Sequence, residues 1–231
     1  MMFYGIHKVT LLDFPEKVAA TLFTGGCNLT CPFCHNPELV NLDKNFRPIS
    51  FKEILQFLNK RKKVLQGVCI TGGEPLLHKE LPEVIQEIQT LGFSVKLDTN
   101  GTLPENLKKC KPDYIAMDIK TSFDKYSRLG YKGQLSELTS RLKESIEWII
   151  KSGINHEFRT TVVPALVEKE DITKITAELS GAKLYVLAQF RAENTLDKNY
   201  ESIVPYPKTI LFEMKKIIEE RNIPCMIRAD Y

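Results

Sequence analysis

The sequence has little of what marks a membrane, secreted or nucleic-acid-binding protein. No stretch approaches the roughly 18 consecutive apolar residues of a membrane span, and the first residues lack the basic-then-apolar order of a signal peptide. The net charge is only +3, and the one dense basic run, Lys60-Arg61-Lys62-Lys63, suits a helix C-terminus better than a nucleic-acid surface. We therefore expect a cytoplasmic protein that binds neither membrane nor nucleic acid.

Cysteine is also scarce, with six in 231 residues. Cys27, Cys31 and Cys34 nevertheless fall on one short stretch, and in the cytosol such clustering indicates metal or redox chemistry and not a disulfide framework. The other three are scattered, which is typical of cysteines that pack as small apolar residues. Because there is no second C-x2-C group, we expect no additional ferredoxin-like cluster module.

Short β-rich runs alternate with helical patterns along the chain. The strands are expected at 18–23, 67–71, 93–97, 114–119, 157–163 and 183–189, with a terminal strand at 225–228. The helices are expected at 51–60, 81–91, 104–109, 138–150, 172–179 and 210–221. Ser50 and Glu53 have the spacing of a capping box, and Gly92 that of a helix C-cap.

Six alternations of strand and helix predict an α/β protein with a parallel sheet. We expect a partial (β/α)6 TIM-like barrel, because six units are fewer than the eight of a complete barrel. A doubly wound open sheet is the structural alternative. Without a linker, a repeat or a low-complexity segment, the chain is interpreted as a single domain over residues 1–231.

The three clustered cysteines have the spacing C-x3-C-x2-C. Three thiolates can hold three irons of a [4Fe–4S] cubane, whereas electron-transfer clusters use four cysteines. The fourth iron then stays open for a substrate, as a catalytic metal position must. The alternatives are three structural cysteines or a zinc site, for which His35 is the nearest fourth ligand but is poorly placed beside Cys34.

Each polar motif lies at the C-terminal end of an expected strand. The cysteines follow the first strand, and the motifs at the ends of the later strands are Gly72-Gly73-Glu74-Pro75, Asp98-Thr99-Asn100-Gly101, Met117-Asp118-Ile119-Lys120, Val163-Pro164 and Gln189. In parallel β/α folds the carboxyl ends of the strands meet on one face, where sites are built. The sequence therefore predicts one site assembled from these segments.

These segments, together with Thr10-Leu11-Leu12-Asp13-Phe14-Pro15, resemble the radical S-adenosylmethionine (SAM) superfamily, whose signature is this cysteine loop after the first barrel strand. The resemblance extends from residue 10 to about residue 191. It is closer to the activating enzymes of glycyl radical enzymes, and among them to the anaerobic ribonucleoside-triphosphate reductase activating proteins. It implies a radical SAM fold, a [4Fe–4S] cluster on Cys27, Cys31 and Cys34, and SAM on the fourth iron.

The resemblance also implies a set of residues that bind SAM: Phe33, His35, Gly72, Gly73, Glu74, Asp98, Asn100, Asp118, Lys120, Arg159, Thr161 and Gln189. The Gly-Gly-Glu segment would contact the methionine amino group, and Phe33 would border the adenine. Asp98 could hold the ribose or, with Asp118, a monovalent cation. Lys120 and Arg159 could pair with the SAM carboxylate or with internal carboxylates. Gln189 departs from the histidine of formate-lyase activases, which weakens that assignment.

By the same resemblance, reductive cleavage of SAM gives a 5′-deoxyadenosyl radical that takes hydrogen from a glycine of a partner. The partner would be a glycyl radical enzyme, the reductant of the flavodoxin or ferredoxin type, and no side chain would be catalytic beyond the cluster and SAM. The alternative enzyme is a small-molecule radical SAM enzyme similar to 7-carboxy-7-deazaguanine synthase. Two non-enzymatic alternatives are an iron–sulfur electron carrier and a zinc-binding module.

Overall fold

The computed structural model describes residues 1–42 and 46–229. By contacts, the chain forms two compact units. The first unit contains Met1–Asn28, Glu38–Thr99 and Glu105–Ile115, and the second contains Leu29–Pro37, Asn100–Pro104 and Ala116–Tyr231. The boundary at residue 115 lies inside strand β7 (Tyr114–Asp118), so the chain passes from one unit to the other within a strand.

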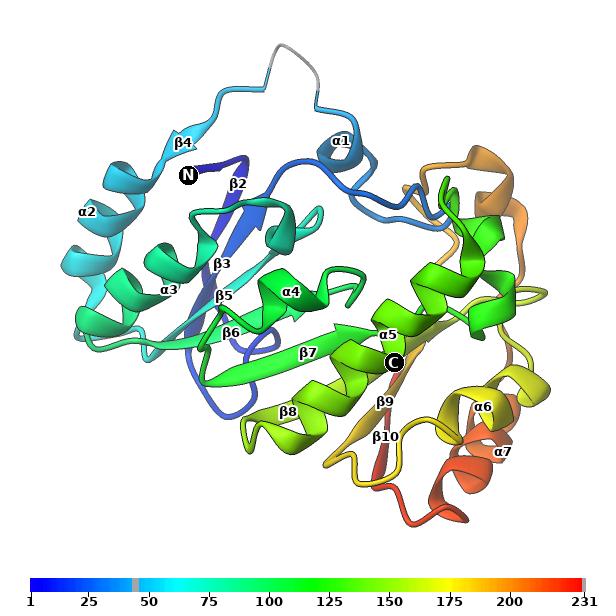
Figure 1. The fold of residues 1–231 in the computed structure, drawn as a ribbon. Coiled ribbons are helices and arrows are strands. Elements are labelled where there is room, and N and C mark those ends of the chain that lie inside the picture. Colours follow the sequence, from blue (N-terminus) through cyan, green and yellow to red (C-terminus); the bar gives the residue numbers. More distant parts are fainter. Residues whose placement is uncertain (43–45, 230–231) are drawn as a thin grey trace. The chain divides into compact units, whose positions relative to one another are not determined.

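The first unit contains a mostly parallel sheet (Figure 1). Its strands lie in the order β6 (Ser94–Thr99), β5 (Gly67–Gly72), β3 (Ala19–Thr24) and β2 (Gly5–Thr10), and only β2 is antiparallel. Five of the six residues of β3 are buried, as expected for a parallel strand covered on both faces. A two-residue antiparallel pair joins β1 (Met2–Phe3) to β4 (Ile49–Ser50).

Helices connect these strands. They are α1 (Pro37–Val40), α2 (Phe51–Arg61), α3 (Leu81–Thr90), α4 (Pro104–Leu107) and the 3-10 turn η1 (Pro75–Leu77). The predicted capping box at the start of α2 is confirmed, since Glu53 N donates to Ser50 Oγ at 3.3 Å and Ser50 N donates to Glu53 Oε2 at 2.8 Å. Gly92 follows α3 with a φ of 95°, the left-handed conformation that glycine adopts at helix ends.

The second unit contains a parallel sheet of β8 (Asn155–Val162), β9 (Tyr185–Gln189) and β10 (Cys225–Arg228). Its helical segments are η2 (Phe123–Leu129), α5 (Leu135–Lys151), α6 (Lys169–Thr176), η3 (Lys198–Ser202) and α7 (Lys208–Glu219). Helices α6 and α7 pack together, and α7 also packs on β9 and β10 (Figure 1). Helix α5 buries Leu138, Leu142, Ile146 and Ile149, which form its apolar face.

The seven expected strands and six expected helices are confirmed, with ends shifted by up to three residues. The basic run begins in the last turn of α2, as predicted for a helix end. The sequence did not predict β2, in which three of six residues are exposed, none is buried, and apolar side chains do not alternate. Among the residues that the structure describes, no helix is long and apolar enough to cross a membrane.

Candidate active site

The cysteine loop begins three residues after β3 and carries three cysteines that are not in disulfides. Cys27 and Cys34 are half-buried, and Cys31 is buried. The remaining cysteines, Cys69, Cys110 and Cys225, are buried in strands and turns as predicted. Burial raises the pKa of Cys110 and of Cys225 to about 12, which keeps both as unreactive thiols at neutral pH.

In the first unit, the start of the cysteine loop is bonded to the Gly-Gly-Glu segment at the end of β5. Gly73 N donates to Thr24 O at 2.9 Å, and Glu74 N donates to Gly26 O at 2.8 Å. A Cβ atom on Gly73 would lie 1.9 Å from Gly26 O, and one on Gly72, whose φ is 113°, would lie 2.5 Å from Thr24 N. The two glycines are therefore required for the close approach of two strand-end loops.

Glu74 is buried and is already engaged with the protein. Its Oε1 atom accepts hydrogen bonds from Leu76 N at 3.1 Å and from Thr99 Oγ1 at 2.7 Å. The carboxylate thus caps η1 and ties it to the end of β6. Thr99 belongs to the Asp98-Thr99-Asn100-Gly101 segment but was not expected to contact Glu74; only the register of β5 against β6 brings the two together.

Asp98 lies near the end of β6 and forms an ion pair with Lys96. The Lys96 side chain is 1% exposed and that of Asp98 is 12% exposed. Lys96 was not among the residues predicted from the sequence. The available signal was the period-two alternation of a strand, which places residues 96 and 98 on the same face.

In the second unit, the rest of the cysteine loop is braced by backbone hydrogen bonds. Thr30 N donates to Leu129 O at 2.9 Å, Leu196 N donates to Cys34 O at 3.1 Å, and Asp197 N donates to Pro32 O at 2.9 Å. Phe33 is 4% exposed. The loop conformation is therefore held by the protein chain itself.

His35 is held by the segment that follows β9. Its Nε2 atom lies 2.9 Å from Arg191 O, and its ring stacks on Phe190 with centroids 6.1 Å apart. Asn194 Nδ2 donates to His35 O at 3.1 Å. These contacts fix the loop beside the end of β9, and the predicted contact of His35 with SAM stays a prediction.

Asp118 lies at the end of β7 between two cations. Lys120 Nζ lies 2.8 Å from its Oδ2 atom, and Arg159 Nε lies 2.7 Å from its Oδ1 atom. Burial alone would raise the pKa of Asp118, but the charges and hydrogen bonds of Arg159 and Lys120 outweigh it and hold the pKa well below its usual range. The internal ion pairs that the sequence left as an alternative for both cations are thus present.

A second carboxylate, Glu157, extends this network and was missed from the sequence. Its side chain is fully buried, and its two oxygens accept from Arg228 NH1 at 3.0 Å and Arg228 NH2 at 2.7 Å. Arg159 NH1 lies 3.8 Å from Glu157 Oε1. Glu157 and Arg159 are in the middle of β8 and Arg228 is on β10, so the network joins β7, β8 and β10.

The remaining expected site residues hold the following positions. Asn100 is buried, and its Oδ1 atom accepts from Thr102 N at 3.0 Å. Thr161 is two residues from Arg159 in β8 and shares its face. Gln189 pairs with Val162, so it lies on the opposite face, and its Nε2 atom donates to Tyr206 O at 3.1 Å.

The cysteine loop has the donor chemistry that the predicted cofactor requires. In a cubane each thiolate binds a different iron, and the loop carries three cysteines that are not in disulfides. Among the described residues, these cysteines included, no three His, Cys, Asp or Glu side chains are grouped closely enough to hold one metal ion. The cluster ligands therefore stay a prediction.

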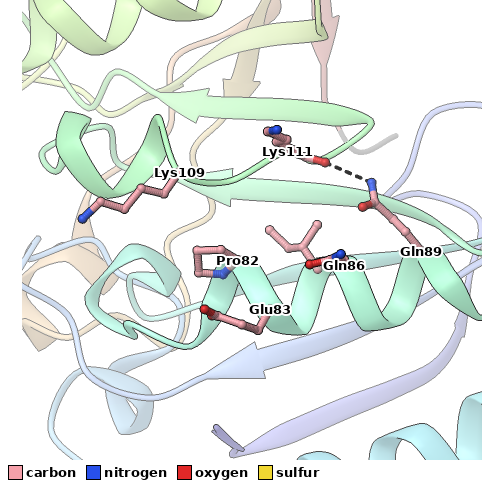
Figure 2. Close-up of a pocket in the computed structure, with 7 residues that line it drawn as sticks. Pro82, Glu83, Gln86, Gln89, Lys109 and Lys111 are labelled. Atoms are coloured by element: carbon pink, nitrogen blue, oxygen red, sulfur yellow. Dashed lines mark hydrogen bonds between the residues drawn. The ribbon is translucent and has the colours of Figure 1, made fainter.

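A separate groove lies on α3 and does not include these residues. Figure 2 shows its lining, which consists of Pro82, Glu83, Ile85, Gln86, Gln89, Lys109 and Lys111. Gln89 Nε2 donates to Lys111 O at 3.0 Å, the bond drawn in Figure 2. The groove is therefore partly closed by its own side chains and belongs to the outer helical surface of the first unit.

Residues 21–177 match the family model described as the Radical SAM superfamily. The chain belongs to the radical SAM superfamily. Membership implies a [4Fe–4S] cluster and SAM, and it confirms the predicted α/β fold of the partial TIM-like barrel type. The resemblance stated from the motifs is thereby confirmed at the level of the superfamily.

Relatives of this radical SAM protein include activating enzymes. It is 32% identical to a putative glycyl-radical enzyme activating enzyme of Methanocaldococcus jannaschii, over 97% of this chain and 95% of the relative. It is 27% identical to the pyruvate formate-lyase-activating enzyme of Clostridium pasteurianum, over 87% of this chain and 85% of the relative. A 7-carboxy-7-deazaguanine synthase of Aquifex aeolicus is 38% identical over 34% of each chain.

Solved structures share the fold. Streptococcus suis SuiB bound to the precursor peptide SuiA has a TM-score of 0.70 at 16% identity, covering 95% of this chain and 50% of that chain. Escherichia coli QueE has a TM-score of 0.62 at 14% identity, covering 99% and 94%. At these identities the likeness concerns the radical SAM fold alone.

Proposed function

We propose that Cys27, Cys31 and Cys34 hold a [4Fe–4S] cluster whose fourth iron binds SAM, and that the protein activates a glycyl radical enzyme. The observation that carries this proposal is the set of three cysteines, none in a disulfide, on one strand-end loop of a chain similar along its length to a putative activating enzyme. The partner that we propose is the anaerobic ribonucleoside-triphosphate reductase, with a reductant of the flavodoxin or ferredoxin type.

The bound, reduced cluster supplies the electron that splits SAM and gives the hydrogen-abstracting radical. The chain positions SAM. Backbone groups of Gly72 and Gly73, with Glu74, would hold the amino group, since they are fixed beside the start of the cysteine loop. Phe33 would shield the adenine from water, with His35 at its side. Asp98, Asn100 and Thr161 would offer polar atoms to the ribose or carboxylate. The contact of Gln189 with SAM stays a prediction, because its side chain lies on the face of the sheet opposite to Thr161.

Lys120 and Arg159 would hold the SAM carboxylate. Their side chains are 22% and 19% exposed, so both remain accessible. An ammonium has three N–H donors and a guanidinium has five, more than either gives to Asp118. A monovalent cation at Asp98 and Asp118 stays a prediction, and each of these carboxylates already has a basic partner in the structure.

A small-molecule reaction is the second candidate, because of the similarity to a 7-carboxy-7-deazaguanine synthase over 78 residues. Such an enzyme would turn over a small substrate and would give no radical on a protein partner. The relative matched along the full chain is a putative activating enzyme, and this is why we favour the first candidate.

The cluster ligands can be tested by replacing each of the three cysteines with alanine. The anaerobically reconstituted protein should contain about four irons per chain and convert SAM to 5′-deoxyadenosine when a reductant is present. Each variant should lose cluster iron and this conversion. Cys110→Ala, which removes a buried thiol elsewhere, is the control and should keep both. Full turnover by Cys27→Ala would show that the assignment is wrong.

The activase role can be tested by incubating the reduced protein and SAM with candidate glycyl radical enzymes. A glycyl radical signal in electron paramagnetic resonance, dependent on both SAM and the anaerobic ribonucleotide reductase, is the expected result. Absence of signal with every candidate, together with turnover of a purine-like small molecule, would favour the second candidate.

A further inference from the structure

A buried lysine lies beside one of the proposed SAM residues. Lys96 is in the middle of β6, and its side chain is 1% exposed. Its Nζ atom forms an ion pair with Asp98 Oδ1 and lies 3.9 Å from Cys69 Sγ. Cys69 on the neighbouring strand β5 pairs with Lys96 in the sheet register. The side chains of Cys69, Lys96 and Asp98 therefore lie on the same face of the sheet.

The fold alone does not explain a charge at this position. Lysine is almost never fully buried unless its charge is paired, because removing an ammonium from water is costly. The other face of β6 is apolar, with Val95 and Leu97 fully buried. An apolar side chain at residue 96 would fill the same space without this cost, and the partner that balances the buried charge is Asp98.

The position of Asp98 indicates that role. It lies one residue before the end of β6, two residues beyond Lys96, and keeps 12% of its side chain exposed. Lys96 therefore reaches Asp98 from within the sheet, and the carboxylate keeps a small exposed area. A positive charge in this place favours the ionised carboxylate and restricts its rotation.

We propose that Lys96 is a built-in counter-ion that positions Asp98, so that SAM binds here without a monovalent cation from solution. Lys96 supplies the positive charge that a bound potassium or sodium ion would otherwise supply to the carboxylate. The inference rests on the proposed function, since Asp98 is one of its SAM residues. Lys96 is a positioning residue and acts on SAM only through Asp98.

The test compares Lys96→Met, which has a similar length and no charge, with the wild-type protein. SAM affinity of the reconstituted proteins is measured by isothermal titration calorimetry in N-methylglucamine chloride and in potassium or sodium chloride at equal ionic strength. N-methylglucamine is too large to replace the ammonium. Lys63→Met is the matched control, because it removes the charge of an exposed lysine in the same unit.

The wild type and Lys63→Met should bind SAM equally well in all three salts. Lys96→Met should bind about tenfold more weakly in N-methylglucamine chloride, the effect of one lost charge-assisted contact, and should recover in potassium or sodium chloride. General damage to the fold would not be repaired by an alkali ion. A wild type that needs potassium or sodium would overturn the proposal, and so would a Lys96→Met variant with wild-type affinity in every salt.

A second measurement separates this inference from the proposed function. The thermal midpoint of each protein, without SAM, is compared between the same salts. If Lys96 is the counter-ion, only Lys96→Met should gain stability from potassium or sodium relative to N-methylglucamine. If Lys96→Met gains stability in this way but the wild type does not bind SAM, the proposed SAM site would be contradicted, while the role of Lys96 as counter-ion of Asp98 would be supported. Equal midpoints in all salts for Lys96→Met would contradict the counter-ion itself.

Discussion

Several side chains that were expected to face SAM also have partners within the protein. Glu74 accepts from Leu76 N and Thr99 Oγ1, and Asp118 balances Lys120 and Arg159. A carboxylate has about four lone-pair sites, and each cation has several donors, so these groups can bind a ligand while keeping one protein contact. At the scale of the residue, these protein contacts therefore hold the side chains in place before SAM binds and limit how far they must move on binding.

His156 gives a prediction for the pH dependence of stability. It is 2% exposed; its Nδ1 donates to Ile154 O at 2.9 Å, and its Nε2 accepts from Lys183 N at 3.2 Å. Burial lowers its pKa below the ordinary value of 6.5. The unfolded chain therefore binds the proton first, and the free energy of unfolding should fall as pH drops below 6.5.

The measurement is the urea midpoint at pH 7.5 and pH 5.5. His156→Gln keeps an amide donor and acceptor but has no titrating group, so it should lose less stability between these pH values than the wild type. His7→Gln, at an exposed histidine of β2, should keep the wild-type difference. The same pH difference in His156→Gln and the wild type would refute the assignment.

At the scale of the element, the contact between the loops after β3 and β5 depends on glycine for two different reasons. Gly26 has a φ of 82°, and a Cβ there would meet nothing within 4 Å. Gly73 has no such conformation, but a Cβ there would overlap the backbone oxygen of Gly26. One position needs conformational freedom, and the other needs the absence of a side chain.

Alanine substitutions should separate these two causes. Gly26→Ala should lower the free energy of unfolding by about 1–2 kcal/mol, the cost of left-handed backbone. Gly73→Ala should cost at least about 3 kcal/mol, because backbone must move to relieve the overlap. Urea unfolding of the cluster-free variants gives both values. If Gly73→Ala lowers the free energy of unfolding no more than Gly26→Ala does, the close approach of the loops after β3 and β5 is not needed for stability.

At the scale of the whole molecule, the two compact units are interleaved along the chain. Each unit contains three separate segments, and one boundary lies inside β7. A unit cannot be completed until several distant segments are in place. We therefore expect the units to unfold together, which agrees with the prediction of a single domain over residues 1–231.

The single tryptophan makes this testable. Trp148 is in α5 of the second unit, so its fluorescence reports that unit, while far-ultraviolet circular dichroism reports helices of both. The two urea midpoints should coincide. A reporter variant with Trp148→Phe and Phe51→Trp, which moves the probe to α2 of the first unit, should give the same midpoint. Separate midpoints would show two independent domains.

Local sequence determined the elements and their order in this protein. Apolar runs and caps are properties of neighbouring residues, and so β3, β5, β6, α2 and α3 were predictable, as was the position of each motif at a strand end. The spacing of Cys27, Cys31 and Cys34 likewise needed no structure. By contrast, the edge strand β2 was not predicted, because its residues do not alternate between apolar and polar.

Tertiary structure alone decided which charges meet across the sheet. Glu157 and Arg228 looked like ordinary strand residues, yet strand order and side-chain reach bring them together as an ion pair. Glu157 and Arg228 are far apart in the chain and lie on β8 and β10, with β9 between them. Pairing of buried charges depends on distances across a sheet, and these are set by strand order and register, which no short stretch of sequence encodes.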